Sequence, residues 1–256
     1  MVFKILQWIN KRTWKYYFLK TKLKRLPSLN YPEKGDLEYQ KNLIKMFDKK
    51  NKQTSFMTCP GLLDLLYSKF DAKENFNFLD FGGEKIDFYL SLKREFKNVN
   101  YFIYNQKTIL DTFYKLKTEF DYSSLNIVGN YDEIFKKKYD FVNFGSCVQY
   151  LNDYENILKK ISNNSNYIFL SATHLYDSTE YELKKNFVVK QIMGFSQPLF
   201  LYFFNRHDLF SILEKEEFKL IFEKKNLTDR PNYKNFQGHL SNITYADFLF
   251  FKEKNF

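Results

Sequence analysis

The chain has 256 residues, of which 44% are hydrophobic and 27% are charged. This balance excludes a largely disordered protein, because so much apolar surface can fill a substantial core. Lysine and arginine outnumber aspartate and glutamate by 40 to 30, and this excess of positive charge favours an anionic partner.

The cysteines and the apolar runs bear on the cellular setting. Cys59 and Cys147 have neither metal-type nor redox-type spacing, so we expect a reduced, cytoplasmic environment. The longest strongly apolar run, residues 198–204, is far shorter than the roughly 20 residues that a membrane-spanning helix needs. The sequence therefore predicts neither secretion nor a crossing of the bilayer.

Residues 1–26 carry lysines and arginines but no acidic residue, and apolar residues recur at every seventh position from Val2 to Leu23. This pattern predicts a basic amphipathic helix. Such a helix suits peripheral contact with the anionic inner face of a membrane. It equally suits a helix that packs on the main domain with its lysines in solvent.

Pro27 and Pro32 interrupt this pattern, and residues 36–50 are again helical in character. We therefore divide the chain into a basic helical extension, residues 1–55, and a main domain, residues 56–256.

Strands and helices alternate through the main domain. The predicted strands are residues 76–81, 99–104, 125–128, 139–144, 167–170, 218–222 and 244–251. The predicted helices are residues 61–70, a stretch ending near 97, 109–120, 132–137, 154–161 and 206–214. This order predicts an α/β fold, a seven-stranded, mostly parallel Rossmann-like sheet with helices on both faces.

The first of these strands runs into two adjacent glycines, Gly82 and Gly83, and a helical pattern follows. Glycines at such a turn let the backbone come close to a ligand, and the start of the next helix offers free N–H groups. The turn is typical of a nucleotide-type pocket.

Three motifs carry a resemblance to a known family: LDFGG at residues 79–83, SCVQYL at residues 146–151 and FVVKQ at residues 187–191. With these motifs the order of elements resembles the Rossmann-like methyltransferases that use S-adenosylmethionine. More narrowly, it is similar to a bacterial group often associated with surface-polysaccharide genes. The resemblance implies O-methylation of a small-molecule or carbohydrate acceptor, and it extends from about residue 62 to residue 251.

The resemblance implies roles for the residues around the glycine turn. Gly82 and Gly83 would pass under the amino-acid end of the cofactor, and Asp80 would receive its ammonium group. Asn105 stands where the family has an acid that binds the ribose hydroxyls. Ser146 and Gln149 follow a strand at the edge of the sheet where ligands of open α/β folds bind, and they would contact the cofactor in the cleft beside the acceptor.

Two positions depart from the family pattern. Ile86 stands where the family has a third glycine, and Asn105 replaces the ribose-binding acid. An amide gives up the charge-assisted hydrogen bond that a carboxylate would make. These changes leave open a divergent enzyme, another cofactor pose, or a degenerate relative that only binds a partner or a membrane.

His174 is the best candidate for a base that removes the proton of an acceptor hydroxyl, because imidazole titrates near neutral pH. Asp153 is the second candidate, although a capping role at a helix start explains it equally well. His207 and His239 have no carboxylate or cysteine at ligand spacing, so no metal is predicted. An RNA methyltransferase is a further alternative, but the sequence contains no recognisable RNA-binding module, so it does not favour nucleic acid as a partner.

Overall fold

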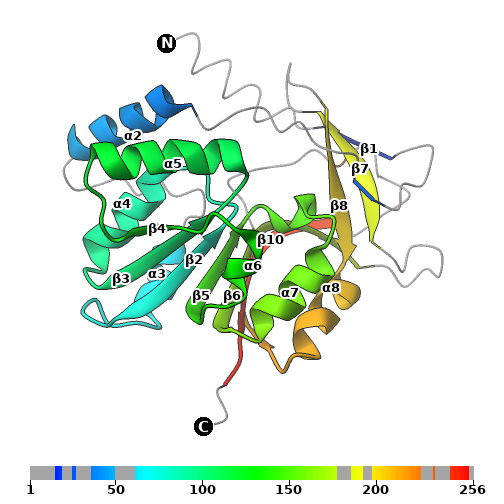
Figure 1. Ribbon diagram of the computed structural model, residues 1–256. Helices are drawn as coiled ribbons and strands as arrows, with labels where there is room; N and C mark the ends of the chain where they lie inside the picture. Colours follow the sequence, from blue (N-terminus) through cyan, green and yellow to red (C-terminus); the bar gives the residue numbers. More distant parts are fainter. Residues whose placement is uncertain are drawn as a thin grey trace. The chain divides into compact units, whose positions relative to one another are not determined.

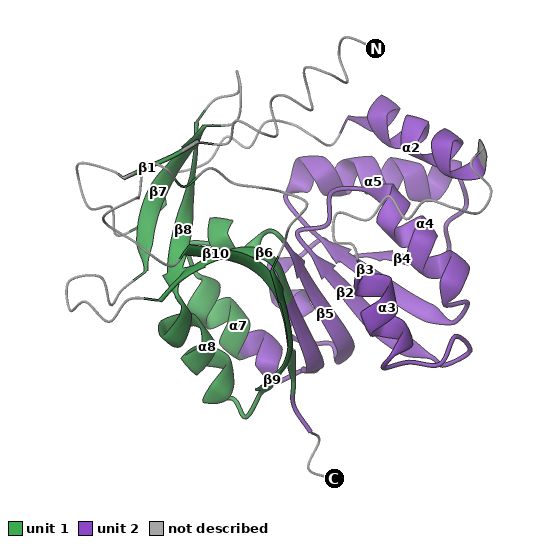
Figure 2. Cartoon of the chain, turned by 180° about the vertical axis from the view of Figure 1, so that it is seen from behind, with its two compact units in different colours: residues 1–32, 146–159, 170–251 green, residues 33–145, 160–169, 252–256 purple. Residues whose placement is uncertain are grey.

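The computed structural model describes residues 15–18, 25–26, 36–49, 61–177, 186–192, 198–225, 233 and 243–253. The chain divides into two compact units, which Figure 2 shows in different colours. Unit 1 comprises residues 1–32, 146–159 and 170–251, and unit 2 comprises residues 33–145, 160–169 and 252–256.

Unit 2 contains a parallel sheet in the order β6-β5-β2-β3-β4. Its strands are β2 (Phe76–Phe81), β3 (Val99–Tyr104), β4 (Leu125–Ile127), β5 (Tyr139–Gly145) and the first part of β6 (Ser165–Tyr176). β2 lies at the centre, paired in parallel with β3 and β5, and nearly all of its side chains are buried. A strand buried on both faces explains the almost unbroken apolar run that marked it in the sequence.

Aromatic side chains build the two faces of this sheet. The Phe78 ring lies 5.7 Å from that of Tyr101 and 5.4 Å from that of Phe141, with Phe88 of helix α4 (Ile86–Glu95) packed at 5.5 Å. On the other face, the Phe81 ring lies 4.9 Å from that of Phe144. Large aromatic rings therefore fill a core that other sequences build from branched aliphatic residues.

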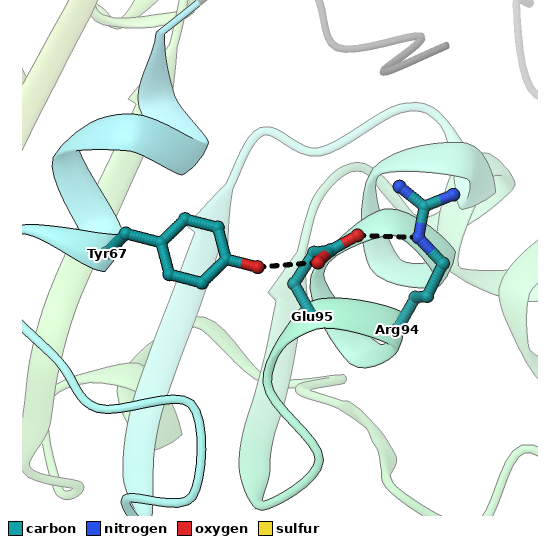
Figure 3. A network of polar contacts seen from close by, with 3 residues as sticks. All are labelled: Tyr67, Arg94 and Glu95. Carbon is teal, nitrogen blue, oxygen red and sulfur yellow. Dashed lines mark hydrogen bonds and ion pairs between the residues drawn. The ribbon is translucent and has the colours of Figure 1, made fainter. Parts of the chain in front are cut away.

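The remaining described helices of unit 2 have the bounds α2 (Leu37–Lys49), α3 (Leu62–Tyr67), α5 (Lys107–Glu119) and α6 (Tyr131–Ile134). A surface network joins α3 to α4, because Glu95 accepts a hydrogen bond from Tyr67 at 2.5 Å and pairs with Arg94 at 2.6 Å (Figure 3). The hydrogen bond to Glu95 is the main reason that the pKa of Tyr67 rises to about 12.

The predicted helix at residues 36–50 is confirmed as α2, which lies alongside α4 and α5 (Figure 1). The side chain of Asp36 caps it by accepting the N–H of Glu38 at 3.0 Å. Leu43 and Ile44 are buried on one side of α2. α2 is thus an integral part of unit 2.

Unit 1 contains strands in the order β1-β7-β8-β6, and β10 pairs with both β6 and β9. Their bounds are β1 (Lys15–Phe18), β7 (Phe187–Ile192), β8 (Leu199–Asn205), β9 (Lys219–Lys225) and β10 (Ile243–Phe251), with β6 continuing to Tyr176. β1 with β7, β7 with β8, and β9 with β10 are antiparallel, whereas β6 and β8 are parallel. The helical elements are η1 (Val148–Tyr150), α7 (Tyr154–Ser162), which begins in unit 1, and α8 (Arg206–Glu214).

The structure corrects the prediction for part of the N-terminal segment. Residues 15–18 form strand β1 and not a helix, and the Tyr16 side chain is fully buried while that of Tyr17 is half-buried. Consecutive aromatic residues favour a strand, and pairing with β7 outweighs the helical spacing. The rest of residues 1–26, apart from Arg25 and Leu26, lies outside the described residues, and so does most of the predicted membrane-binding surface.

β7 and β8 are further strands that the sequence did not predict, and β6 extends well beyond the predicted residues 167–170. β6 and β8 are largely buried, so the alternation of apolar and polar residues that marks a half-exposed strand is weak in them. No helix in the described parts of the chain is long and apolar enough to cross a membrane.

Candidate functional site

The first group of candidate residues lies at the end of β2 and is centred on Asp80. Its side chain is buried, and both carboxyl oxygens accept hydrogen bonds. Oδ2 accepts one from the Tyr101 hydroxyl at 2.6 Å, and Oδ1 accepts one from Nδ2 of Asn143 at 2.8 Å. The sheet register explains this, because Asp80 lies opposite Asn143 in β5 and shares a sheet face with Tyr101 in β3.

Burial raises the pKa of Asp80 to about 6, and the hydrogen bonds from Tyr101 and Asn143 oppose this effect only in part. The carboxylates of Glu84 and Asp87 raise it further. Asp80 therefore titrates near neutral pH, and a cation close to it would favour the ionised form.

Asn143 was missed by the sequence analysis. Its Oδ1 is buried and has no hydrogen-bond partner among the described residues, which costs about 1–3 kcal/mol when no ligand satisfies it. The signal in the sequence was a polar residue between Val142 and Phe144, within the apolar part of the strand at residues 139–144. Asp80 and Asn143 thus give this end of β2 two neighbouring acceptors.

The two glycines of the turn are required for different reasons. Gly82 has a φ of 83°, in the left-handed region that glycine tolerates best. A Cβ at Gly83 would lie only 2.2 Å from Oδ2 of Asp80. Gly82 therefore makes the turn possible, and Gly83 makes room for the carboxyl beneath it.

Asn105 connects the end of β3 to this turn. Its Nδ2 donates to the carbonyl oxygen of Gly83 at 2.8 Å, and its Oδ1 accepts the N–H of Gln106 at 2.7 Å. A carboxylate could not make the first of these bonds, because it has no hydrogen to donate. The amide at this position therefore has a structural task that the family's acid could not perform.

The start of α4 differs from the expected set of open N–H groups. The Ile86 N–H donates to Oε1 of Gln40 at 2.9 Å. Burial raises the pKa of Asp87, while hydrogen bonds from the backbone N–H groups of Phe88 and Asp87 itself lower it. Because protein groups already bind these N–H groups, the helix start is not an open anion site.

Ser146 and Gln149 lie in unit 1, around a strained stretch of β6. The Gln149 side chain is buried, and its Nε2 donates to the carbonyl oxygens of Ser146 at 3.0 Å and Ala172 at 3.1 Å. Ser146 and Ala172 have positive φ angles of 58° and 51°. Oε1 of Gln149 has no hydrogen-bond partner within the described ranges.

Asp247 of β10 is a second residue that the sequence analysis missed. Its Oδ1 accepts the N–H of Ala172 at 2.7 Å, so Asp247 and Gln149 hold Ala172 from its two peptide groups. A non-glycine residue in this conformation costs about 1–3 kcal/mol, and such residues cluster at functional sites. This stretch of unit 1 is therefore a second group of candidate residues.

His174 lies within β6, beyond the predicted strand at residues 167–170, and it is part of a chain of hydrogen-bonded polar side chains. Tyr150 donates to Gln191 at 3.1 Å, and Gln191 donates to the Tyr16 hydroxyl at 3.0 Å. The Tyr16 hydroxyl lies 3.5 Å from Nε2 of His174, and the Tyr233 hydroxyl lies 2.7 Å from its Nδ1. Sequence reasoning singled out His174 but not its contacts, because its partners come from positions far away in the chain.

Burial lowers the pKa of His174 to about 3, so the imidazole is uncharged at neutral pH. Its ring stacks on Phe203 with centroids 4.8 Å apart. Burial also raises the pKa of Tyr16 and Tyr233 well above their ordinary value. The whole chain of groups is therefore neutral under physiological conditions.

Asp153 lies just before α7 and is exposed. Its Oδ2 accepts a hydrogen bond from Nδ2 of Asn156 at 2.8 Å, and its carbonyl accepts the N–H of Ile157 at 3.0 Å. These contacts belong to the first turn of a helix. Across the described residues, no group of three or more His, Cys, Asp or Glu side chains could hold a metal ion.

Two crystal structures of the N-terminal domain of EvdMO1 are similar to this chain. The one determined in the presence of SAH and D-fucose has a TM-score of 0.54 at 14% identity, over 84% of this chain and 96% of that chain. The two chains share an α/β, Rossmann-like fold. The second structure, with SAH bound, has a TM-score of 0.53 at 13% identity, over 84% of this chain and 97% of that chain.

At this identity the likeness concerns the fold alone. No protein-family model matches the sequence, and no curated protein matches it. Any activity must therefore be argued from the candidate residues themselves.

Proposed function

We propose that this protein is a methyltransferase that uses S-adenosylmethionine to methylate a hydroxyl group of a small molecule or carbohydrate. The observation that carries the proposal is the turn after β2, where Gly83 lies directly over a buried Asp80, in a fold similar to that of the SAH-bound EvdMO1 domain. The SAH in the EvdMO1 structures supports the cofactor, and the D-fucose in one of them supports a sugar-like acceptor.

The residues around Asp80 fit the cationic end of this cofactor. Oδ1 of Asn143 is a buried acceptor in need of a donor, and an ammonium group has three hydrogens to donate. Asp80 and Asn143 would hold the ammonium group, and Gly82 and Gly83 would allow close approach of the backbone. The bound cofactor would supply an electrophilic methyl group on a positively charged sulfur.

Ser146 and Gln149 are our further candidates for contacts with the cofactor, and His174 is our first candidate for the base. Oε1 of Gln149 can accept a hydrogen bond from a ligand. His174 is a weak base because burial lowers its pKa, yet a weak base suffices if the proton leaves after the carbon–oxygen bond has formed, since a hydroxyl alkylated on oxygen is strongly acidic. Asp153 remains a second candidate base, although its contacts are those of a helix start.

Isothermal titration of the protein with SAH tests the proposal. We expect a Kd in the micromolar range, which corresponds to a binding free energy of about −8 kcal/mol. Gly83→Ala should weaken this binding, and Gly129→Ala should leave it unchanged. Gly129 is exposed, and a Cβ there would meet only the terminal hydroxyl of Tyr114 at 3.2 Å. An absence of heat at millimolar SAH would refute the proposal.

A specific observation favours a second candidate, a degenerate relative that does not catalyse methyl transfer. Both polar groups of Asn105 already bind the protein, at Gly83 and Gln106, which leaves less of its capacity for ribose hydroxyls. SAH binding without methyl transfer to any of a panel of sugars, phenols and hydroxy acids would favour this candidate.

A further inference from the structure

Helix α2 lies outside the part of the chain that resembles a methyltransferase, yet it sends one side chain to the glycine turn. The Gln40 side chain is fully buried. Its Nε2 donates to the carbonyl oxygen of Glu84 at 2.7 Å, and its Oε1 accepts the N–H of Ile86 at 2.9 Å. The amide thus binds both backbone groups that flank Lys85.

This arrangement imitates the pairing of two β-strands. Lys85 is extended, with φ −129° and ψ 130°, and contributes no side-chain cap to α4. In a parallel sheet, one residue of the neighbouring strand donates its N–H to the C=O that precedes such a residue, and its own C=O accepts the N–H that follows. Here the carboxamide of Gln40 offers both, so it fixes where the extended turn ends and where α4 begins.

Further contacts hold α2 against α4 and α5. Lys41 pairs with Glu119 of α5 at 2.7 Å, and the guanidinium of Arg94 in α4 lies 5.2 Å from the ring centre of Phe47. Leu43 and Ile44 are buried below. Gln40 is therefore held by a packed helix and does not adapt freely to the turn.

The contact also bears on the position where the sequence departs from the methyltransferase pattern. Ile86 is fully buried, and its N–H is one of the first helical N–H groups, which have no partner within the helix. Gln40 supplies that partner. The branched residue is thus accommodated because α2 satisfies its backbone and fixes its place.

We propose that Gln40 is a positioning residue for the cofactor, which acts by holding residues 84–86 in the conformation that the Gly82–Gly83 turn needs to bind it. This inference rests on the proposed function. It assigns to α2, a segment outside the resemblance, a part in cofactor binding.

The test compares SAH affinity, by isothermal titration, in the wild type, Gln40→Leu and Gln40→Glu. Asn42 provides the matched control, because it is an exposed amide on the same helix, and Asn42→Leu and Asn42→Asp should bind SAH as the wild type does. Loss of two buried hydrogen bonds predicts an affinity about tenfold lower or more for Gln40→Leu.

Gln40→Glu separates positioning from general stability. A protonated glutamic acid can donate to Glu84 and accept from Ile86, whereas a carboxylate can only accept. Glu84 and Asp87 are the acidic neighbours, Lys85 is the basic one, and Tyr39 is the adjacent titratable group on α2. Because position 40 is fully buried beside acidic groups, the pKa of the introduced glutamic acid would be raised above its usual value. We therefore expect the ratio of its SAH affinity to that of the wild type to be close to one at about pH 5.5 and to fall about tenfold by about pH 8. Referring each value to the wild type at the same pH removes the contribution of Asp80.

Hydrogen exchange of the Ile86 amide gives a readout that needs no ligand. Its exchange should accelerate in Gln40→Leu while the amides of β3 remain as protected as in the wild type. If the wild type binds SAH but the Gln40 variants bind it equally well, this inference is overturned alone. If the wild type binds no SAH, the proposed function is overturned and the inference with it.

Discussion

The carboxyl of Asp80 occupies the space that a side chain at Gly83 would need, since a Cβ there would lie 2.2 Å from Oδ2 and 2.6 Å from Cγ. The carboxyl cannot easily move away, because Tyr101 and Asn143 bind both of its oxygens. The turn and the acid beneath it therefore constrain each other.

The first prediction concerns Gly83→Ala. Forcing a methyl group into this space should destabilise the protein by about 1–3 kcal/mol, and it should weaken SAH binding by displacing Asp80. Urea unfolding measures the first effect and titration calorimetry the second. Gly129→Ala is the control, and equal stability of the two variants would contradict the close contact between Gly83 and Asp80.

The second prediction concerns Asp80→Asn. Because the pKa of Asp80 is raised to about 6 in the folded protein, its contribution to stability is fully present below about pH 4 and is lost as the pH rises through about 6. Above this range the charged acid costs on the order of 3 kcal/mol. The asparagine variant should therefore be more stable than the wild type at about pH 7.5. The difference in stability between the two proteins should be smaller at about pH 4.5.

The same variant should bind SAH about tenfold more weakly, because it loses the charge-assisted bond to the ammonium group. A gain in stability together with a loss in affinity identifies a residue kept for function. Unfolding in urea at both pH values, with titration of SAH at about pH 7.5, measures the two effects. Unchanged affinity would remove Asp80 from the proposed cofactor site.

The third prediction concerns the pH dependence caused by His174. Its pKa is lowered to about 3 in the folded protein, so the unfolded chain binds a proton first as the pH falls below about 6.5. The wild type should lose about 1.4 kcal/mol of stability per pH unit from this group between about pH 6 and pH 3. His174→Gln should lack this component, which unfolding experiments at about pH 7.5 and pH 4.5 would measure. His207→Gln, an exposed position in α8, is the control and should behave as the wild type.

The fourth prediction concerns Asn105→Asp. The substitution removes the hydrogen bond to the Gly83 carbonyl and leaves a carboxylate oxygen facing that carbonyl. This should lower the free energy of unfolding by about 1–3 kcal/mol. The variant would have the acid that binds the ribose in the family, but the glycine turn would have lost its hydrogen bond to residue 105. We therefore expect lower stability and no gain in SAH affinity. Tighter SAH binding at unchanged stability would mean that Asn105 has no structural task and that the chain has merely lost the family's acid at this position.

The sequence predicted much of unit 2 because its elements follow local rules. The run into Gly82 and Gly83 ends in a left-handed residue that glycine accommodates, and β2 and β3 have the predicted bounds. The resemblance directed attention to Asp80, but its partners Tyr101 and Asn143 depend on the register between strands. Register is not readable from one strand at a time.

Unit 1 was harder to predict for a related reason. Tyr16 belongs to a short strand whose partner β7 is distant in the chain, and helical spacing misled the prediction for this stretch. Gln191, Tyr233 and Asp247 matter through contacts with His174 and Ala172. The sequence around each of these polar residues does not indicate which residue it contacts.

The pairing of β1 with β7 has a consequence for biosynthesis. Phe18 lies opposite Val189, so the ribosome releases the first strand long before its neighbour exists. Tyr16 is fully buried in the folded protein, so its side chain remains exposed to water or a chaperone until β7 has been synthesised. Such long-range pairing slows folding and leaves an unpaired edge open to aggregation, so recovery of native protein should depend on the rate of translation and the supply of chaperones more than its thermodynamic stability alone would suggest.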